Sequence, residues 1–258
     1  MSTTSATCCE RMEREQYAVM ARREVRHWWY AGMRSVALAV LESAIGSRRG
    51  LRLLDAGCGT GGTTVELRRF GDVVGVDVAW EALRPARERG LNRLARASVE
   101  RLPFRTASFD VVTSFEVLYH LGVSSDTQGL QELRRVLKPD GLLLLRVPAH
   151  DWLRGEHDRL VHTRHRYSRG EVRQKLEANG FAVERLSWAN TLLFPAAAAK
   201  RLFERSDTGD AAAEPDLWQP PGPINEALKA LVAVEAGAIP RGVPLPFGLS
   251  LLAVARAA

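Results

Sequence analysis

An apolar stretch that runs directly into closely spaced glycines constrains this chain more than any other feature. Leu53 and Leu54 precede Asp55, and residues 57–62 then read Gly-Cys-Gly-Thr-Gly-Gly. Such a loop lets the backbone turn sharply and lets a ligand approach it without interference from Cβ atoms. The spacing is GxGxG rather than GxGxxG, and we expect Asp55 to stand inside the loop. A carboxylate there favours a cationic ligand over the anionic pyrophosphate of a dinucleotide.

Short apolar runs alternate with helical patterns over most of the chain. This alternation predicts βαβ units and a parallel sheet. The runs that we interpret as strands are 51–55, 72–77, 94–98, 109–114, 142–147, 181–188 and a last strand at 248–255. The uninterrupted Leu142–Leu145 run is typical of a central strand covered on both faces.

The segments outside the strands suggest one domain with additions. Residues 10–46 predict helix ended by Gly46, and Ser168 with Glu171 predicts a capping box. Residues 206–223 are rich in Asp, Ala, Gly and Pro, which is typical of a loop or lid, and a helical pattern resumes at 225–237. We therefore divide the chain into an N-terminal helical cap (1–48) and a main domain (49–258) with a helical or lid insertion near 191–244.

Charge and cysteine content indicate which cellular environment and which binding partners to expect. The 258 residues contain 36 Lys and Arg against 30 Asp and Glu, with a pI near 9.6, a modest excess that does not by itself imply nucleic-acid binding. Three cysteines without metal-ligand spacing favour a reducing cytoplasm. No uncharged apolar run reaches about 18 residues. The apolar segment 191–199 precedes Lys200 and Arg201, so peripheral contact with a membrane stays open beside a buried helix.

Four ordered segments resemble class I S-adenosylmethionine (SAM)-dependent methyltransferases of the group that includes ubiquinone-type and small-molecule enzymes. The segments are the glycine loop, the strand ending at Asp77, residues 97–104 and residues 108–120, and Leu133–Gly141 adds to them. The resemblance covers about residues 50–190. It implies a Rossmann-like α/β fold with a seven-stranded, mostly parallel sheet, an antiparallel last strand and an N-terminal helical cap.

The resemblance implies SAM as the cofactor and assigns residues to it. In that family the glycine loop wraps the methionine part, the residue matching Asp77 binds ribose, and the pair matching Ser98 and Val99 meets adenine. This chain has Ser98 where the family commonly has Asp, which removes charge assistance from that contact. The expected cofactor residues are Asp55, Gly57, Cys58, Gly59, Gly61, Asp77, Val78, Ser98, Val99, Glu100 and Phe115.

Residues that follow strands four and five have positional priority for the acceptor, because ligands of open α/β sheets bind beyond the carboxyl ends of the strands. Our candidates for catalysis are His150 first, then His120 and Tyr119, with a histidine base suited to a hydroxyl or ammonium acceptor. The segments 27–34 and 157–167 resemble one bacterial branch of the family, linked to glycan, lipid or secondary-metabolite pathways. We expect Trp29, His157, Arg166 and Tyr167 to contact a small or lipid-linked acceptor.

Plainer interpretations remain for several of these residues. Asp77 is also suited to a helix N-cap, Trp29 to simple packing, and His120 to capping its helix. A nicotinamide-dependent oxidoreductase and a non-catalytic SAM-binding partner subunit are the alternative functions. Nucleic-acid methylation is disfavoured because no Asn/Asp-Pro-Pro-Tyr motif is present. We expect no metal site, and the sequence leaves the acceptor, the methylated atom and the oligomeric state open.

Overall fold

The computed structural model describes residues 17–155, 158, 163–204 and 220–258. Most of the predicted lid at 206–223 lies outside these residues. Within the described part, seven strands form one sheet in the order β3-β2-β1-β4-β5-β7-β6. The strands are β1 (Leu51–Ala56), β2 (Gly71–Asp77), β3 (Leu94–Arg96), β4 (Phe109–Phe115), β5 (Leu137–Pro148), β6 (Phe181–Ala189) and β7 (Ser250–Ala257).

The strand directions confirm the predicted fold class. Strands β1 to β5 pair in parallel with one another, whereas β7 runs antiparallel to both β5 and β6. β5 begins earlier than predicted because Leu137 already pairs with Phe109 before the register shifts to Leu142 opposite Val111. Residues 138–141 therefore form a bulge within β5, where Asp140 takes a left-handed φ of 57°.

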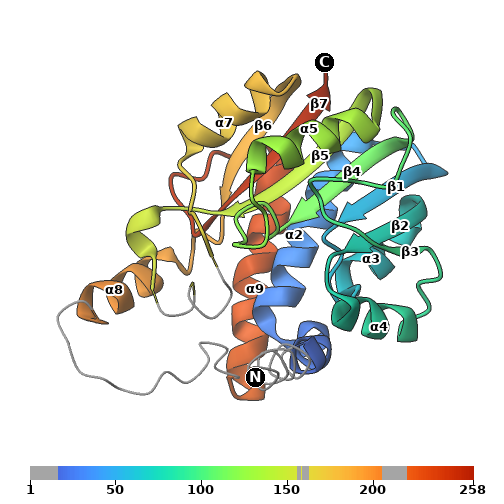
Figure 1. Ribbon diagram of the computed structural model, residues 1–258. Helices are drawn as coiled ribbons and strands as arrows, with labels where there is room; N and C mark the ends of the chain where they lie inside the picture. The colour runs from blue at the N-terminus through green and yellow to red at the C-terminus, as the bar shows by residue number, and fades with distance from the viewer. Residues whose placement is uncertain (1–16, 156–157, 159–162, 205–219) are drawn as a thin grey trace, which may run out of the picture.

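Helices cover both faces of the sheet (Figure 1). They are α2 (Trp28–Ile45), α3 (Gly62–Leu67), α4 (Trp80–Glu88), α5 (Asp126–Val136), α7 (Arg169–Ala178), α8 (Phe194–Glu204) and α9 (Gly222–Ala238), with 3-10 turns at Arg68–Phe70, Asp151–Leu153 and Ile239–Arg241. None of the helices in the described part is long and apolar enough to cross a membrane.

Two apolar layers sandwich the sheet. α2 and α9 lie side by side on one face of the sheet (Figure 1). Leu142 and Leu144 of β5 belong to the apolar layer on this face. Leu143 and Leu145 point to the opposite face, into the layer that α5 and α7 complete. The alternation explains why this strand is apolar at every position, since each of its faces is buried. Most of α2 therefore packs on the sheet as part of the main core.

The N-terminal segment differs from the single predicted helix. Residues 17–26 are helical, but His27 has an extended backbone and caps α2, with its Nδ1 accepting from Trp29 N at 3.3 Å. The chain is thus broken into a short helix and α2. At α7, Ser168 Oγ accepts from Glu171 N at 3.2 Å as predicted, whereas the Glu171 carboxylate bonds His165. That half of the predicted capping box is used for a tertiary contact.

Candidate active site

The glycine loop joins β1 to α3 in a backbone conformation that side chains resist. Gly57, Gly59 and Gly61 have φ values of 87°, 52° and 84°. A Cβ on Gly57 would lie 2.1 Å from Cγ2 of Val117, and one on Gly61 would lie 2.6 Å from Leu91. The beginning of the loop is bonded to β2, because the amides of residues 57 and 58 both donate to Val76 O at 2.8 Å. Glycine is thus required here both for conformation and for space.

Asp77 ends β2 and ties that strand to the loop. Its Oδ2 accepts from Gly59 N and its Oδ1 from Ala79 N, each at 2.9 Å. Burial raises the pKa of Asp77, although both of these hydrogen bonds and the charge of His120 oppose the rise. The N-cap of α4 is Ala79, which has no side-chain cap, so Asp77 stands two residues ahead of it. Asp77 therefore shapes the loop whatever ligand it binds.

Asp55 lies in β1 and not, as expected, inside the loop. It is buried, and its two oxygens accept from Thr64 Oγ1 at 2.6 Å and Thr113 Oγ1 at 2.8 Å. Burial raises the pKa of Asp55 to about 6, above its ordinary 3.8. The carboxylate thus joins β1, α3 and β4 beneath the loop.

The expected adenine side is built from a turn after β3. Ser98 Oγ accepts from Glu100 N at 3.2 Å, and Val99 is buried in the core. The Glu100 carboxylate accepts from Ser124 Oγ at 2.6 Å and from Ser125 N at 2.8 Å, so it holds the turn that begins α5. The Val78 side chain is 61% exposed. Cys58 is buried with its Sγ against Gly75.

A polar cluster follows β4 against the glycine loop. Glu116, at a left-handed φ of 60°, accepts from Arg146 Nε of β5 at 2.8 Å. The Arg146 guanidinium also lies over the rings of Phe115 and Trp29, at 5.2 and 5.6 Å. Burial raises the pKa of Tyr119 well above its ordinary value, and Glu116 adds to this by its charge and a hydrogen bond. Sequence reasoning singled out Phe115, Tyr119 and Trp29 but not Arg146.

The two candidate histidines lie in different surroundings. His120 stacks on Tyr119 with ring centroids 5.7 Å apart, and its charge lowers the pKa of Asp77. His150 has a left-handed φ of 62° and stacks on Trp188 of β6, with ring centroids 4.7 Å apart and planes 7° apart. Its buried Nε2 has no hydrogen-bond partner within the described residues. Burial and the charge of Arg166 lower the pKa of His150, so the neutral ring is favoured.

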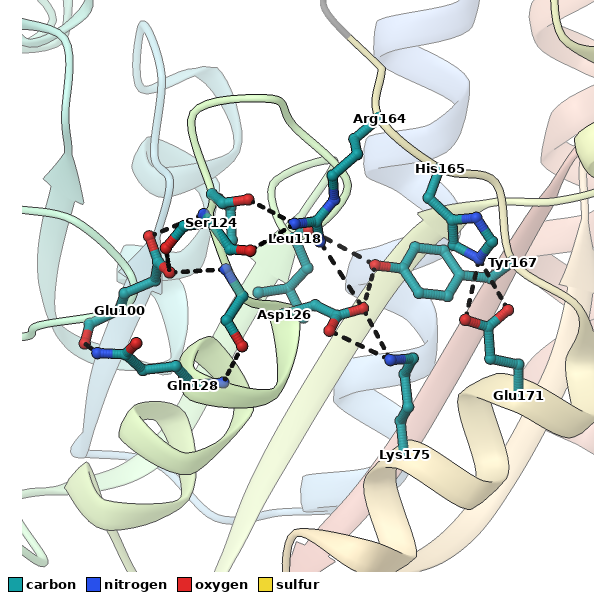
Figure 2. A network of polar contacts seen from close by, with 12 residues as sticks. Glu100, Leu118, Ser124, Asp126, Gln128, Arg164, His165, Tyr167, Glu171 and Lys175 are labelled. Atoms are coloured by element: carbon teal, nitrogen blue, oxygen red, sulfur yellow. Dashed lines mark hydrogen bonds and ion pairs between the residues drawn. The ribbon is translucent and has the colours of Figure 1, made fainter.

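The segment after residue 162, expected at the acceptor, uses its polar groups inside the protein (Figure 2). Tyr167 OH donates to Asp126 at 2.9 Å, and Lys175 also bonds Asp126. Arg166 contacts both oxygens of Asp158, at 2.7 and 3.1 Å. The Tyr167 bond fastens the segment to α5, and the bond of His165 to Glu171 fastens it to α7. The acceptor roles of Arg166 and Tyr167 remain predictions, and His157 lies outside the described residues.

Two buried carboxylates near the site carry no motif that sequence reasoning could have found. Glu24, in the helix at 17–26, accepts from Thr60 Oγ1 of the glycine loop at 2.6 Å. Glu235 of α9 accepts from the amides of Asn190, Thr191 and Leu192 at 2.6, 2.7 and 3.1 Å. Glu235 thereby positions the turn between β6, which carries Trp188, and α8. Both contacts join residues more than 30 positions apart.

Comparison with known proteins agrees with this geometry. A family model described as a methyltransferase domain matches residues 54–145. The ubiquinone biosynthesis O-methyltransferase of Xanthomonas oryzae pv. oryzae is 35% identical over 155 residues, which cover 53% of this chain and 62% of that protein. The first four curated relatives are matched over 42% to 62% of their own length, so the chain spans about half of them.

Solved structures share the fold over most of the chain. A chain from the complex that contains the Haloferax volcanii Trm112 methyltransferase activator has a TM-score of 0.60 at 23% identity, covering 95% of this chain and 96% of that one. A SAM-dependent methyltransferase from Mesorhizobium loti has a TM-score of 0.55 at 19% identity, over 84% and 95%. With the sheet order, the glycine loop and the matched sequence segments in agreement, residues 54–145 match the methyltransferase domain family, and the fold is that of the class I SAM-dependent methyltransferases.

Proposed function

We propose that the protein moves the methyl group of SAM to an oxygen, nitrogen or carbon atom of a small-molecule, glycan or lipid-linked acceptor. The observation that carries the proposal is the glycine loop at 57–61, held in left-handed conformations and bonded to the carboxylate of Asp77. SAM, the cofactor that the family implies, supplies an electrophilic methyl group on a sulfonium. The residues present fit it: Gly57, Gly59 and Gly61 put no side chain between the loop backbone and a ligand, and the surrounding carboxylates suit a cation.

The chain's own contribution is to bind and orient. We infer that Asp77 accepts the ribose hydroxyls, since each carboxylate oxygen keeps a second lone pair after bonding the amides. Residues 98–100 are proposed to meet adenine, and Val78 and Phe115 to flank the cofactor. Orientation of the two reactants can supply about 7 to 11 kcal/mol toward such a displacement.

We propose that the cluster after β4 forms one rigid wall of the reaction site. Val117 packs on Gly57, so its neighbour Glu116 stands against the loop, locked by Arg146. The raised pKa of Tyr119 keeps its phenol protonated near neutral pH, which suits a hydrogen-bond donor and excludes a base. Trp29 lies over Arg146 and is proposed to border the acceptor.

His150 is the proposed base. Its lowered pKa keeps the imidazole neutral near pH 7, and its buried Nε2 is an available nitrogen within the described structure. Accepting a proton at Nε2 would activate a hydroxyl or ammonium acceptor. His120 is a second candidate because it follows β4 and stacks on Tyr119. Arg166, Tyr167 and peripheral membrane contact by the segment around α8 are further proposals for a lipid-linked acceptor.

The experiment that tests this function combines binding with turnover. Calorimetric titration of the purified protein with SAM, S-adenosylhomocysteine and NADH is expected to show binding of the first two ligands. Incubation with methyl-labelled SAM and a metabolite extract is expected to yield a labelled product that a heat-denatured sample does not form. NADH binding without SAM binding would establish an oxidoreductase instead. SAM binding without any labelled product across the extracts would favour a non-catalytic subunit.

A further inference from the structure

The solvent side of α9 is apolar over most of the helix. Ile224, Leu231 and Val234 are 44%, 41% and 62% exposed. The exposed positions on this side recur every three or four residues and are Pro223, Ile224, Ala227, Ala230, Leu231 and Val234. The opposite side holds the buried Val232 and packs on α2. Since a surface helix normally turns polar residues toward solvent, this apolar face of α9 is suited to a further contact.

The apolar face of α9 begins beside a basic part of the helix at 17–26 (Figure 1). Asn225 Nδ2 donates to Arg26 O at 3.0 Å, and Asn225 Oδ1 accepts from Trp28 N at 2.9 Å, so the first turn of α9 is fixed to the end of that helix. Arg22 and Arg26 are exposed there, together with Val25 at 55% exposure. Neither guanidinium forms an ion pair within the described part of the chain.

A hollow of about 450 Å³ adjoins these arginines. The described residues that line it are Val19, Arg22, Arg23, Arg26 and His27. Guanidinium groups donate hydrogen bonds in a fork that matches the oxygens of a phosphate. Because no carboxylate is among these lining residues, the hollow favours an anionic group.

The other end of the apolar face of α9 is also basic. Arg241 is exposed, and its Nη1 donates to Gly237 O in the last turn of the helix. Of the two acids in α9, Glu235 is buried and Glu226 pairs with Lys229 Nζ at 2.8 Å. The apolar face thus lies between arginines whose charge no exposed acid of α9 balances.

These charges disfavour a second copy of the chain as the partner. Two copies with antiparallel α9 helices would bring Arg26 of one copy near Arg241 of the other, and parallel helices would bring each arginine near its counterpart. Like charges across an interface oppose binding. A bilayer with anionic headgroups instead offers an apolar layer to α9 and phosphates to the arginines.

We propose that the apolar face of α9 and the arginines beside it bind the protein to a membrane surface that contains anionic lipids. The apolar side chains enter the boundary between headgroups and acyl chains, and Arg22 and Arg26 bind lipid phosphates. This surface is distinct from the segment around α8. Because membrane binding requires neither SAM nor an acceptor, the inference goes beyond the proposed function and is tested independently of it.

Vesicle binding by the full chain tests the proposal. The protein is sedimented with vesicles of phosphatidylcholine alone and with vesicles that also contain phosphatidylglycerol. We expect binding to the second kind only, and weaker binding as the salt concentration rises. An arginine near an anionic surface contributes about fivefold in affinity, so Arg22→Gln with Arg26→Gln should weaken binding by about 25-fold. Leu231→Gln with Val234→Gln should weaken it by at least about tenfold, because both side chains leave the apolar layer.

Two controls match these variants. Arg84→Gln with Arg173→Gln removes the same amount of charge from exposed side chains of α4 and α7. Ala233→Gln places the same amide on α9 at an exposed position outside the apolar face. Both controls should bind vesicles like the wild type, and thermal unfolding checks that every variant is folded.

Three outcomes would overturn the proposal. The first is a wild type that does not bind anionic vesicles, or equal losses in a variant and its control. The second is a wild-type dimer in sedimentation velocity that Leu231→Gln with Val234→Gln dissociates, which would assign the face to a second copy. The third is calorimetric binding of inorganic phosphate without vesicle binding, which would assign the hollow to a free anion.

Discussion

Replacing Asp77 by alanine tests the cofactor site most directly. In the structure its two oxygens each bond one backbone amide at 2.9 Å, one in the glycine loop and one before α4. Asp77→Ala removes both bonds and the proposed acceptor of the two ribose hydroxyls. The variant should therefore lose affinity for the cofactor by more than it loses stability.

The contacts give the size of both effects. Each hydrogen bond to a charged group is worth about 1.5 to 3 kcal/mol. Two ribose hydroxyls then account for about 3 to 6 kcal/mol, or roughly 10²-fold to 10⁴-fold in Kd. Asp77 is half-buried, so water can reach the amides that it leaves, and we expect the free energy of unfolding to fall by only about 1 to 3 kcal/mol.

Calorimetric titration with S-adenosylhomocysteine measures the affinity, and urea denaturation measures the stability. Asp72→Ala is the control, since Asp72 is the second residue of the same strand and forms an exposed ion pair with Arg93. It should bind like the wild type. If Asp77→Ala proves unfolded, Asp77→Asn preserves the size of the side chain and is titrated instead. An affinity within twofold of the wild type in a folded variant would refute the ribose role.

Three further predictions concern groups around the site. Burial raises the pKa of Asp55 to about 6, so the ionised group destabilises the fold as pH rises from its ordinary 3.8 through that value. One pKa unit corresponds to about 1.4 kcal/mol, so the free energy of unfolding of the wild type should fall by about 3 kcal/mol relative to Asp55→Asn between about pH 4 and about pH 7. Urea denaturation at both pH values measures this, and a difference between the two proteins that does not change with pH would contradict it. His150→Ala should lower kcat on the true acceptor at least about 100-fold while calorimetry finds cofactor affinity within twofold, and unchanged turnover would remove His150 as base. Glu235→Gln should lower the free energy of unfolding in urea by about 2 kcal/mol, because an amide replaces a buried carboxylate that accepts from three amides; equal stability would show that this cap contributes little.

Local patterns were sufficient for most of the fold. Strands buried on both faces are apolar throughout, and left-handed turns require glycine, so β1, the glycine loop and β5 could be predicted from neighbouring residues alone. Ser168 marked the start of α7 for the same reason, since an N-cap bonds an amide three residues away. The break at His27 was missed because histidine is not a typical N-cap residue, so the sequence does not indicate that a helix begins there. No glycine or proline marks the break either.

Prediction from the sequence misplaced or missed residues whose main contact is with a residue far away in the sequence. Asp55 was expected inside the loop, but its carboxylate is satisfied by Thr113, which lies 58 positions away. In the sequence, Arg146 is a single charged residue in an otherwise apolar strand. The structure shows that it is buried, at 7% exposure, and that its charge is compensated by the ion pair with Glu116. The polar segment at 163–167 is rich in titratable groups, yet the fold uses Arg166 and Tyr167 for internal bonds.

The sequence by itself determined the sheet, the glycine loop and the resemblance to a methyltransferase family, because these depend on periodicity and on residues adjacent along the chain. Only the tertiary structure decided that Glu24 covers the loop, that Glu116 is locked by Arg146, and that His150 stacks on Trp188. Each of these pairs unites segments at least 30 residues apart, through side-chain contacts that leave no periodic trace. Burial then sets the charge state of each group, which is a property of the folded environment and not of the residue type.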